Sequence, residues 1–406
     1  KGWLVYRGYN IFDLCAYSSF EEVSYLLLYG KLPSEDQLKK FKEKLIDYHN
    51  IPKTIRLLAG FPVQDMNAMG ALRLGTNLMR QECTFVDKEE YRPDAETTIS
   101  ADEDSIPMET KPKGEKKAIY SLKRAEGIKK PTGLSKDLHM PVGFESALHL
   151  ISGIPTIAGA VSRLRAGELP LNPDPELSHA GNLIYMLTGR RPSAVEERIM
   201  DISLILHADH GMNASTFATM VVASTLSDLY FAVGSGVAAL NGSLHGGANE
   251  RVIKMLSEIE ESKNVEKWYK KKIAKKEKIS GFGHRVYKAY DPRARVLGPL
   301  AEFLVKSTDN KKNKNLFKIA QKLEKKVVSS LGQKKKIFPN VDFYSGIVYS
   351  CLDIPTELFT PIFAVSRVSG WTARALEYLK NNRIFRPRAV YSGPLDEKYT
   401  PINKRK

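Results

Sequence analysis

The chain has 406 residues, of which 42% are hydrophobic and 9% aromatic, so it can bury a sizeable core, and its length allows two or three domains. Its three cysteines, Cys15, Cys83 and Cys351, are widely separated, which excludes a disulfide framework and a zinc site and fits a reducing, cytosol-like compartment. The formal net charge of +16 favours anionic partners, either nucleic acid or small acidic substrates. We therefore expect a globular cytoplasmic protein without a bound metal.

Helical patterns dominate the chain, because apolar residues recur at steps of three and four positions. Ser18 and Ser19 are N-cap candidates for the first helix, which should end at Gly30. In chain order, the predicted helices cover residues 18–30, 34–49, 195–210, 213–240 and 357–382. Strand-like alternation is confined to residues 3–10 and 388–393. The sequence therefore predicts a mostly α protein.

The longest apolar run, residues 147–164, is interrupted by His149, Pro155 and Arg163. It also falls short of the roughly 20 apolar residues that are needed to cross a bilayer. We therefore predict no membrane span.

The stretch from Asp87 to Asp137 differs from its surroundings, because it is first acidic and then basic and contains few aliphatic residues. Such a segment cannot bury much surface, so we predict a flexible charged insertion, with a docking segment as the alternative. Lysine-rich runs elsewhere, such as residues 267–278, mix lysines with apolar residues at helical spacing. These runs are typical of solvated helix faces.

Nucleotide and nucleic-acid motifs are missing from the sequence. It contains neither a G-x-G-x-x-G nor a G-x-x-x-x-G-K-[ST] phosphate loop, so a Rossmann or P-loop nucleotide site is not expected. Helix-turn-helix, RNA-recognition and zinc-finger patterns are missing too. A basic nucleic-acid-binding protein is therefore only a distant alternative, motivated by the net charge.

Two histidines are surrounded by small residues: His245 in "NGSLHGGANE" and His284 in "SGFGHRVYKAYDPRAR". Glycine beside an imidazole lets backbone and ligand approach closely. Either stretch alone could be a turn or a helix cap that happens to contain a histidine. The pair together favours sites that contact a ligand.

Polar residues suited to chemistry gather in a few short clusters. The clusters contain His207, His210, Asn213 and Ser215; His245; His284, Lys288, Arg293 and Arg295; Asp342; Arg367; and Arg383, Arg386 and Arg388. An arginine binds a carboxylate through two hydrogen bonds, and an imidazole donates or accepts a proton near neutral pH. The set therefore predicts acid–base chemistry on a polycarboxylate.

Several of these residues also have a purely structural alternative. His207 and His210, three positions apart on an apolar helix, could be core residues, and they lack the carboxylate neighbours of a metal site. Asp342 could simply cap a helix that begins beside it. Arg293 could be an ordinary turn arginine.

Five stretches, "LHADHGMNAS", "LHGGANE", "GFGHRVYKAYDPRA", "NVDFYSG" and "RPRAVYSGP", resemble in this order the citrate synthase family, in its shorter bacterial and archaeal form. The resemblance extends over nearly the whole chain apart from the charged stretch. It implies an all-α fold with a large helical domain of residues 1–247 and 353–406 and a small domain of residues 248–352. The active site is then expected in the cleft between the two domains of a homodimer.

The resemblance also implies catalytic roles. His245 is expected to donate a hydrogen bond to the acetyl thioester oxygen, Asp342 to remove the methyl proton, and His284 to contact the oxaloacetate carbonyl. A thioester methyl is a very weak acid, so a carboxylate base needs a donor that stabilises the enolate oxygen. The enol carbon then attacks the ketone, and water hydrolyses the resulting citryl thioester.

Binding roles follow from the same resemblance. The expected oxaloacetate and citrate ligands are His210, Arg293, Arg367 and, from the partner subunit, Arg386. The expected coenzyme A contacts are Lys288 and the backbone of Gly281, Phe282 and Gly283. Two residues, Asn213 and Ser215, are expected to support the histidines. Because Arg386 precedes Pro387, the chain around it should run as an extended arm.

The implied function is that of an acyltransferase, a citrate synthase at the entry to the tricarboxylic acid cycle, which uses acetyl-CoA and oxaloacetate and needs no cofactor. The alternative within the same chemistry is a 2-methylcitrate synthase that uses propionyl-CoA. The two activities share every catalytic residue named above and differ in the shape of the acyl pocket.

Overall fold

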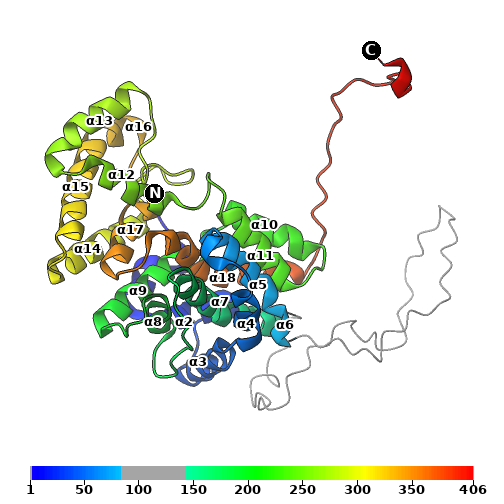
Figure 1. Cartoon of the computed structure of the whole chain (residues 1–406), viewed down its shortest axis with the longest axis horizontal. Helices are drawn as coiled ribbons and strands as arrows, with labels where there is room; N and C mark the ends of the chain where they lie inside the picture. The colour runs from blue at the N-terminus through cyan, green and yellow to red at the C-terminus, as the bar shows by residue number, and fades with distance from the viewer. Residues whose placement is uncertain (1, 84–142, 406) are drawn as a thin grey trace.

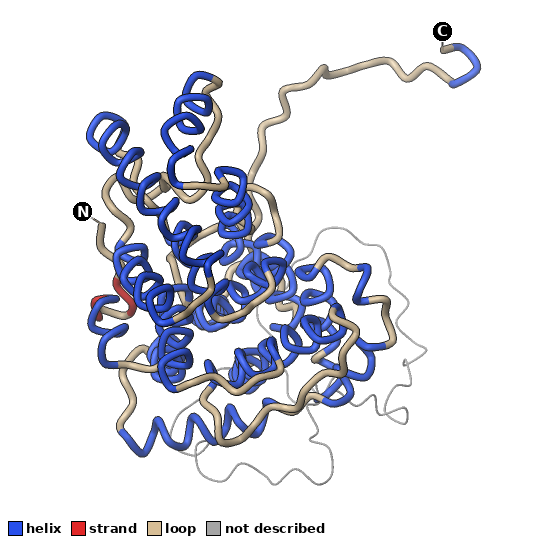
Figure 2. Tube along the Cα trace, turned by 60° about the vertical axis from the view of Figure 1, so that its left-hand side comes forward, coloured by secondary structure: helices blue, strands red, loops and turns tan. Residues whose placement is uncertain are grey.

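The computed structural model describes residues 2–83 and 143–405. The stretch from Asp87 to Asp137, predicted as a charged insertion, lies outside the described residues. Within them the fold consists of helices, with one small hairpin near the N-terminus (Figures 1 and 2). The expected all-α class is confirmed.

The hairpin pairs strand β1 (Val5–Tyr6) with strand β2 (Tyr9–Asn10). Its two turn residues, Arg7 and Gly8, have φ angles of 49° and 95°. Two successive positive φ angles give the tight turn whose twist matches that of the flanking strands. The strand region predicted at residues 3–10 is therefore confirmed.

The first helices are joined by short turns. They are α1 (Ile11–Tyr17), α2 (Phe20–Tyr29), α3 (Glu35–His49), α4 (Pro52–Ala59), the 3₁₀ turn η1 (Val63–Asp65), α5 (Ala68–Leu78) and α6 (Arg80–Cys83). Ser19 caps α2, and Gly30 ends it with a φ of 82°. In α3, Ser34 and Gln37 form a reciprocal capping box. Helices α2 and α3 therefore begin directly after their capping serines.

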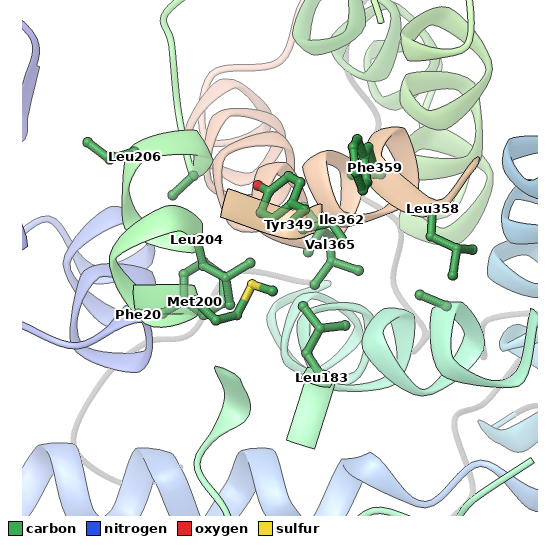
Figure 3. Close-up of a cluster of buried hydrophobic side chains, with 14 of the residues drawn as sticks. Phe20, Leu183, Met200, Leu204, Leu206, Tyr349, Leu358, Phe359, Ile362 and Val365 are labelled. Carbon is green, nitrogen blue, oxygen red and sulfur yellow. The ribbon is translucent and has the colours of Figure 1, made fainter. Parts of the chain in front are cut away.

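The core surrounds two long helices, α7 (Phe144–Arg165) and α18 (Phe359–Leu379), which are buried along most of their length. Four more helices pack around them: α8 (His179–Thr188), α9 (Ala194–His207), α10 (Ala214–Ser224) and α11 (Leu229–Leu240). Figure 3 shows where Leu183 of α8, Met200 of α9 and Val365 of α18 meet in this core. Some of the active-site candidates described below lie at the end of α9 and the start of α10.

Helix α7 is long enough and apolar enough to cross a membrane, but 89% of its most apolar stretch is buried inside the protein. It runs without a break through Pro155, which the sequence analysis treated as an interruption. A proline removes one backbone hydrogen bond, and packing on all sides of α7 compensates for this loss. Helix α7 is thus the central helix of the core.

The remaining helices gather on the left of Figure 1. They are α12 (Ala248–Ile259), α13 (Val265–Ala274), α14 (Pro292–Ser307), α15 (Lys311–Val327), α16 (Gln333–Lys335) and α17 (Val341–Cys351), with the short turns η2 (Ser262–Asn264), η3 (Val328–Gly332, a π-helical turn) and η4 (Thr356–Leu358). Helix α14 packs on α17, and α15 packs on α12 and α13. The proposed boundaries of a large and a small domain remain predictions.

Two helix predictions were wrong in their extent. The helix predicted for residues 195–210 ends at His207, so His210 lies beyond it. Residues 213–240 form two helices, α10 and α11, because Asp228 caps the start of a new helix. Both corrections matter for the site, since they place polar residues at helix ends.

The chain after α18 forms an extended arm, which leaves the helical body and carries only the short turn η5 (Ile402–Lys404) (Figure 1). The strand predicted for residues 388–393 is not formed. A strand needs a neighbouring strand to satisfy its backbone groups, and the arm has none beside it in the described part of the chain.

Candidate active site

The candidate residues come from distant parts of the chain, and most of them lie at or near helix ends. They lie at the end of α9 and the start of α10 (His207, His210, Asn213, Ser215), before α12 (His245), before and within the first turn of α14 (His284, Arg293), at the start of α17 (Asp342) and within α18 (Arg367). Besides burial, the charge of Arg293 acts on the pKa of His210, His284 and Asp342. These groups therefore share one electrostatic environment.

His245 lies half-buried in the turn between α11 and α12. Its Nε2 accepts a hydrogen bond from the backbone N–H of Ser215 at 3.2 Å and lies 2.8 Å from Ser215 Oγ. A nitrogen that accepts from a backbone N–H carries no proton, so the neutral ring is protonated at Nδ1. Burial, and then the charge of Arg367, lowers the pKa of His245 to about 4. The ring is therefore neutral near pH 7, with Nδ1–H as its donor.

Ser215, the partner of His245, is itself held by two side chains. Its Oγ lies 2.7 Å from Asn213 Oδ1 and accepts a hydrogen bond from Trp371 Nε1–H at 3.1 Å. Asn213 is the N-cap of α10, and Trp371 is fully buried in α18. Asn213 and Trp371 thus hold the Ser215 side chain, which in turn contacts the His245 ring. This arrangement fits the supporting role predicted for Asn213 and Ser215.

His284 has the opposite tautomer. The backbone N–H groups of Val286 and Tyr287 donate to its Nδ1 at 3.0 and 3.1 Å, so the neutral ring carries its proton on Nε2. Burial and the charge of Arg293 lower the pKa of His284 and favour this neutral form. The ring stacks on Tyr287, with 4.7 Å between the ring centroids. Its Nε2–H is therefore held in place as a donor.

His210 lies beside His284, with 5.1 Å between the ring centroids, and its Nε2 is 3.2 Å from the Tyr287 hydroxyl. Burial, followed by the charges of nearby arginines, lowers the pKa of His210 strongly, so its ring is neutral. His207, by contrast, is completely buried, and its Nδ1 lies 2.7 Å from the backbone oxygen of Ser203. The interpretation that these histidines are core residues therefore holds for His207 but not for His210.

Arg293 is only 3% exposed and forms a two-point ion pair with Asp291. Its Nε and Nη2 donate to the two Asp291 carboxylate oxygens at 3.1 and 2.8 Å. Asp291 also caps α14 by accepting the Arg293 backbone N–H at 3.0 Å. A buried cation needs such a partner, so Arg293 is not an ordinary turn arginine.

Arg367, within α18, is 1% exposed, and its guanidinium lies 4.7 Å from the centre of the Phe363 ring. Its Nε donates to the backbone oxygen of His207 at 2.6 Å, whereas Nη2 is buried without a hydrogen-bond partner. Burial lowers the pKa of Arg367 to about 10, which still leaves it cationic at neutral pH. A buried guanidinium N–H without a partner is suited to an anionic oxygen of a ligand.

Asp342 lies half-buried in the first turn of α17. The alternative that it caps this helix is wrong, because the N-cap is Asn340, whose Oδ1 accepts the Asp342 backbone N–H at 3.0 Å. Burial raises the pKa of Asp342 to about 6, and the charge of Arg293 opposes this rise. Its carboxylate is therefore a stronger base than an exposed aspartate.

A cavity of about 860 Å³ is lined by Gly281, Phe282 and Gly283, the predicted coenzyme A contacts. Its charged lining residues are Arg251, Lys276, Lys278, Arg285, Lys335 and Glu277. The single carboxylate among them is paired with Lys272 at 2.6 Å. The cavity is therefore strongly cationic and suits a ligand with several negative charges.

Lys288 does not line this cavity. Its side chain is exposed, and its charge contributes to the lowered pKa of His284, after burial and Arg293. The contact of Lys288 with coenzyme A remains a prediction.

Arg386 is exposed at the start of the C-terminal arm. The preceding residue, Phe385, anchors the arm by stacking on Tyr378, with 4.8 Å between the ring centroids. The Phe385 backbone N–H also donates to Ser224 Oγ at 3.2 Å. Beyond this anchor the arm runs away from α14 and α17, the helices that carry Arg293 and Asp342 (Figure 1).

Three residues of the site escaped the sequence analysis. Asp291 had a local signal, because an aspartate before a proline is typical of a helix start. Asn340, two positions before Asp342, had the same kind of N-cap signal. Trp371 had none, since its partner Ser215 is 156 positions away in the chain.

Comparisons with known proteins show the family of the chain. The family model described as "Citrate synthase, C-terminal domain" matches residues 1–388. The citrate synthases of Acidithiobacillus ferridurans and Haloferax volcanii are 38% and 37% identical to the chain, and each match covers all of it and 93% of the relative. The fold and the site define an acyltransferase. The chain belongs to the citrate synthase family.

Solved structures show the same relationship. The citrate synthase of Thermoplasma acidophilum, which was solved as a ternary complex, is 33% identical to the chain and has a TM-score of 0.80, and the match covers all of this chain and 93% of that one. Its ligands in that complex are carboxymethyl coenzyme A and oxaloacetate. The citrate synthase of Thermotoga maritima, at 35% identity, has a TM-score of 0.76 with the same coverage.

Proposed function

We propose that the chain is a citrate synthase, which condenses acetyl-CoA with oxaloacetate and water to give citrate and coenzyme A. The observation that carries the proposal is the pair of neutral imidazoles with opposite tautomers, His245 and His284, in one site with the carboxylate of Asp342. The names of the relatives support it. The chemistry needs no cofactor besides the acyl-CoA substrate, and the cysteine usage fits a cytoplasmic location.

In the first step, the Asp342 carboxylate removes a proton from the methyl group of acetyl-CoA. The electron pair of the C–H bond moves into the thioester, whose oxygen becomes negative and receives the hydrogen bond from His245 Nδ1–H. A neutral donor suffices here, because the donor acts where charge develops in a site shielded from water. The lowered pKa of His245 keeps this donor neutral.

In the second step, the enolate carbon attacks the ketone carbon of oxaloacetate, and a carbon–carbon bond forms. The ketone oxygen gains the electron pair of its π-bond and becomes an alkoxide, which receives the hydrogen bond from His284 Nε2–H. The proton that left the methyl group balances the charge of this alkoxide, which becomes the hydroxyl group of citrate. Arg367 Nη2, which has no partner within the protein, is suited to an oxaloacetate carboxylate. Water then hydrolyses the citryl thioester, so that the thiol of coenzyme A leaves and citrate is released.

The decisive experiment measures thiol release from acetyl-CoA by the purified protein, with and without oxaloacetate. We expect release only when oxaloacetate is present. Propionyl-CoA, the substrate of a 2-methylcitrate synthase, is the comparison substrate, because one methylene in a pocket typically changes kcat/KM by about 10- to 200-fold. A higher kcat/KM for propionyl-CoA would replace the proposed substrate, and no thiol release with either would end the proposal.

The same proposal includes a homodimer in which each active site borrows Arg386 from the partner. The arm that carries Arg386 leaves the body as a single extended chain and bears large exposed apolar residues: Val390, Tyr391, Leu395, Tyr399 and Ile402. Exposed apolar groups in such number along one segment favour a covering surface on another molecule. A second copy of the chain supplies such a surface and receives the arginine.

Subunit mixing tests the borrowed arginine. An Arg386→Leu chain and an Asp342→Asn chain should each be nearly inactive alone. When they are refolded together, about half of the dimers contain both chains, and each of these has one site with both residues intact, so activity should recover to about a quarter of wild type. Confirmed heterodimers without recovery would show that Arg386 does not serve the partner's site.

A further inference from the structure

The loop 281–283, which lines the cationic cavity, is joined to the segment 338–340. Two backbone N–H···O bonds connect them, at 2.8 and 2.9 Å, with an antiparallel bridge in between. The loop directly precedes His284, and the segment directly precedes the first turn of α17, which carries Asp342. Two parts of the chain that bear different catalytic groups are therefore held together at this contact.

One side chain, Asn340, bridges both parts. Its Oδ1 accepts the backbone N–H of Asp342 at 3.0 Å, and its Nδ2 donates to the backbone oxygen of Gly283 at 3.0 Å. The two ends of one planar amide thus fix the helix start on one side and the loop on the other. Asn340 also lines the cavity itself.

Close packing makes this junction stiff. Gly281 has a φ of 80°, and a Cβ there would lie 2.7 Å from a Val252 methyl and 2.8 Å from the Phe343 ring. The ring of Phe282 also packs on Phe343, with 4.5 Å between centroids. The loop therefore touches α17 without spare room, and the amide of Asn340 adds a side-chain bond to this contact.

We propose that Asn340 is a positioning residue, which sets Asp342 in register with His284 by bonding the start of α17 to the loop 281–283. Since this loop lines the cavity for the acyl-CoA, the base and the coenzyme A part of the substrate are placed by the same junction. The proposal rests on the citrate synthase activity proposed above. It assigns Asn340 no contact with the reacting atoms.

The competing explanation is that Asn340 only caps α17. The variant Asn340→Ser separates the two roles, because serine caps a helix about as well as asparagine but is too short to reach the Gly283 oxygen. Asn340→Asp is the second variant: it also caps well, and its carboxylate cannot donate to that oxygen. If one variant does not fold, the other carries the test.

Asn310 provides the matched control. It caps α15 through the same kind of contact, with its Oδ1 accepting the backbone N–H of Lys312 at 3.0 Å and of Asn313 at 3.2 Å. It lies outside the cavity lining, so Asn310→Ser changes only a helix cap. A pure capping effect should therefore look alike in the two serine variants.

The measurements are kcat, the KM for oxaloacetate, Tm, and the deuterium isotope effect on kcat with acetyl-CoA deuterated at its methyl group. We expect Asn340→Ser to lower kcat about 10- to 100-fold, as small misplacements of reacting groups do. The KM for oxaloacetate should stay unchanged, because the substitution does not alter its expected ligands Arg293 and Arg367. The isotope effect should rise, because removal of the methyl proton becomes the slow step.

Two results would overturn the role of Asn340 while leaving the proposed function intact. One is an Asn340→Ser enzyme with the kcat of the Asn310→Ser control. The other is a loss of kcat without any change in the isotope effect, which would indicate a structural role only. A wild-type protein without thiol release would instead end both proposals.

Discussion

At the scale of single residues, two histidines act as donors through different ring nitrogens. In each of them, the nitrogen that accepts a hydrogen bond from a backbone N–H is unprotonated, and the other nitrogen carries the proton. For His284 the donors are two and three positions along the chain, so its tautomer is set locally. For His245 the donor is the backbone of Ser215, 30 positions away, so its tautomer depends on how α10 packs against the turn before α12. A change that shifts α10 should therefore disturb His245 before it disturbs His284.

The role of Asp342 as the base leads to a direct prediction. Asp342→Asn should lower turnover by about 10²- to 10⁴-fold, the usual loss when a general base is removed. Binding of oxaloacetate should persist, because Arg293 and Arg367 keep their positions. Steady-state kinetics together with calorimetric titration of oxaloacetate measures both quantities, and near-normal turnover would rule out Asp342 as the base.

The raised pKa of Asp342 predicts the pH dependence of the reaction. The base must be deprotonated, and its pKa is about 6 in the free protein. We therefore expect kcat/KM for acetyl-CoA to be level above pH 7 and to fall about tenfold per pH unit well below pH 6. His245, whose pKa is lowered to about 4, stays neutral over this range and adds no second step. A level profile down to pH 5 would contradict this assignment.

At the scale of elements, the fit of the loop 281–283 against α17 can be tested with two glycines. Both Gly281 and Gly283 have φ near 80°, but only at Gly281 would an added Cβ collide with Val252 and Phe343. Gly283→Ala therefore measures the strain of the backbone alone, and Gly281→Ala adds overpacking, which typically costs about 1–3 kcal/mol.

The measurement is the free energy of unfolding from denaturant titration of both variants. We expect Gly281→Ala to be less stable than Gly283→Ala by about 1–3 kcal/mol. Equal stability would mean that Val252 and Phe343 move aside without cost, and that the junction is looser than its contacts suggest.

At the scale of the whole molecule, buried histidines should make the protein sensitive to acid. Burial lowers the pKa of four of them to about 3 or 4: His49, His149, His179 and His207. In the unfolded chain the pKa of these groups is about 6.5. As the pH falls, the unfolded state therefore takes up protons at a higher pH than the folded state does. Their contribution to stability is complete above about pH 6.5 and is lost as the pH falls towards 4.

Two carboxyl groups with a raised pKa act in the opposite direction. Burial raises the pKa of Asp201 to about 7 and that of Asp342 to about 6, so their native forms hold protons more tightly than the unfolded chain. They stabilise the fold as the pH falls from about 7 to 4 and offset part of the histidine effect. Because the histidines are more numerous, we expect a net loss of stability between pH 6.5 and 4.5.

Urea unfolding at several pH values between 7.5 and 4.5 measures this loss, and His179→Leu isolates one contribution. His179 is buried, and neither of its ring nitrogens has a hydrogen-bond partner, so leucine removes a proton-binding group without removing a bond. The slope of the free energy of unfolding against pH should become smaller by about 1.4 kcal/mol per pH unit below pH 6. An unchanged slope would show that His179 does not titrate on unfolding.

The sequence by itself determined the all-α class, several helix starts and the identity of most polar groups in the site. Helix starts are encoded locally, because a cap such as Ser19 or Ser34 bonds backbone groups two or three positions away. The paired motifs around His245 and His284 were visible for a similar reason, since glycines in short runs mark close approach of the backbone. The resemblance to the citrate synthase family then gave these groups their expected roles.

Only the tertiary structure decided which of these groups are paired, buried and poised. The Trp371–Ser215–His245 chain and the bond from Asn340 to Gly283 join residues 30 to 156 positions apart, and no local pattern encodes such contacts. The partnerless Nη2 of Arg367 and the raised pKa of Asp342 are likewise products of burial. Burial is set by every helix packed around a residue, so hydrogen bonding and charge inside the site are fixed only once the whole chain has folded.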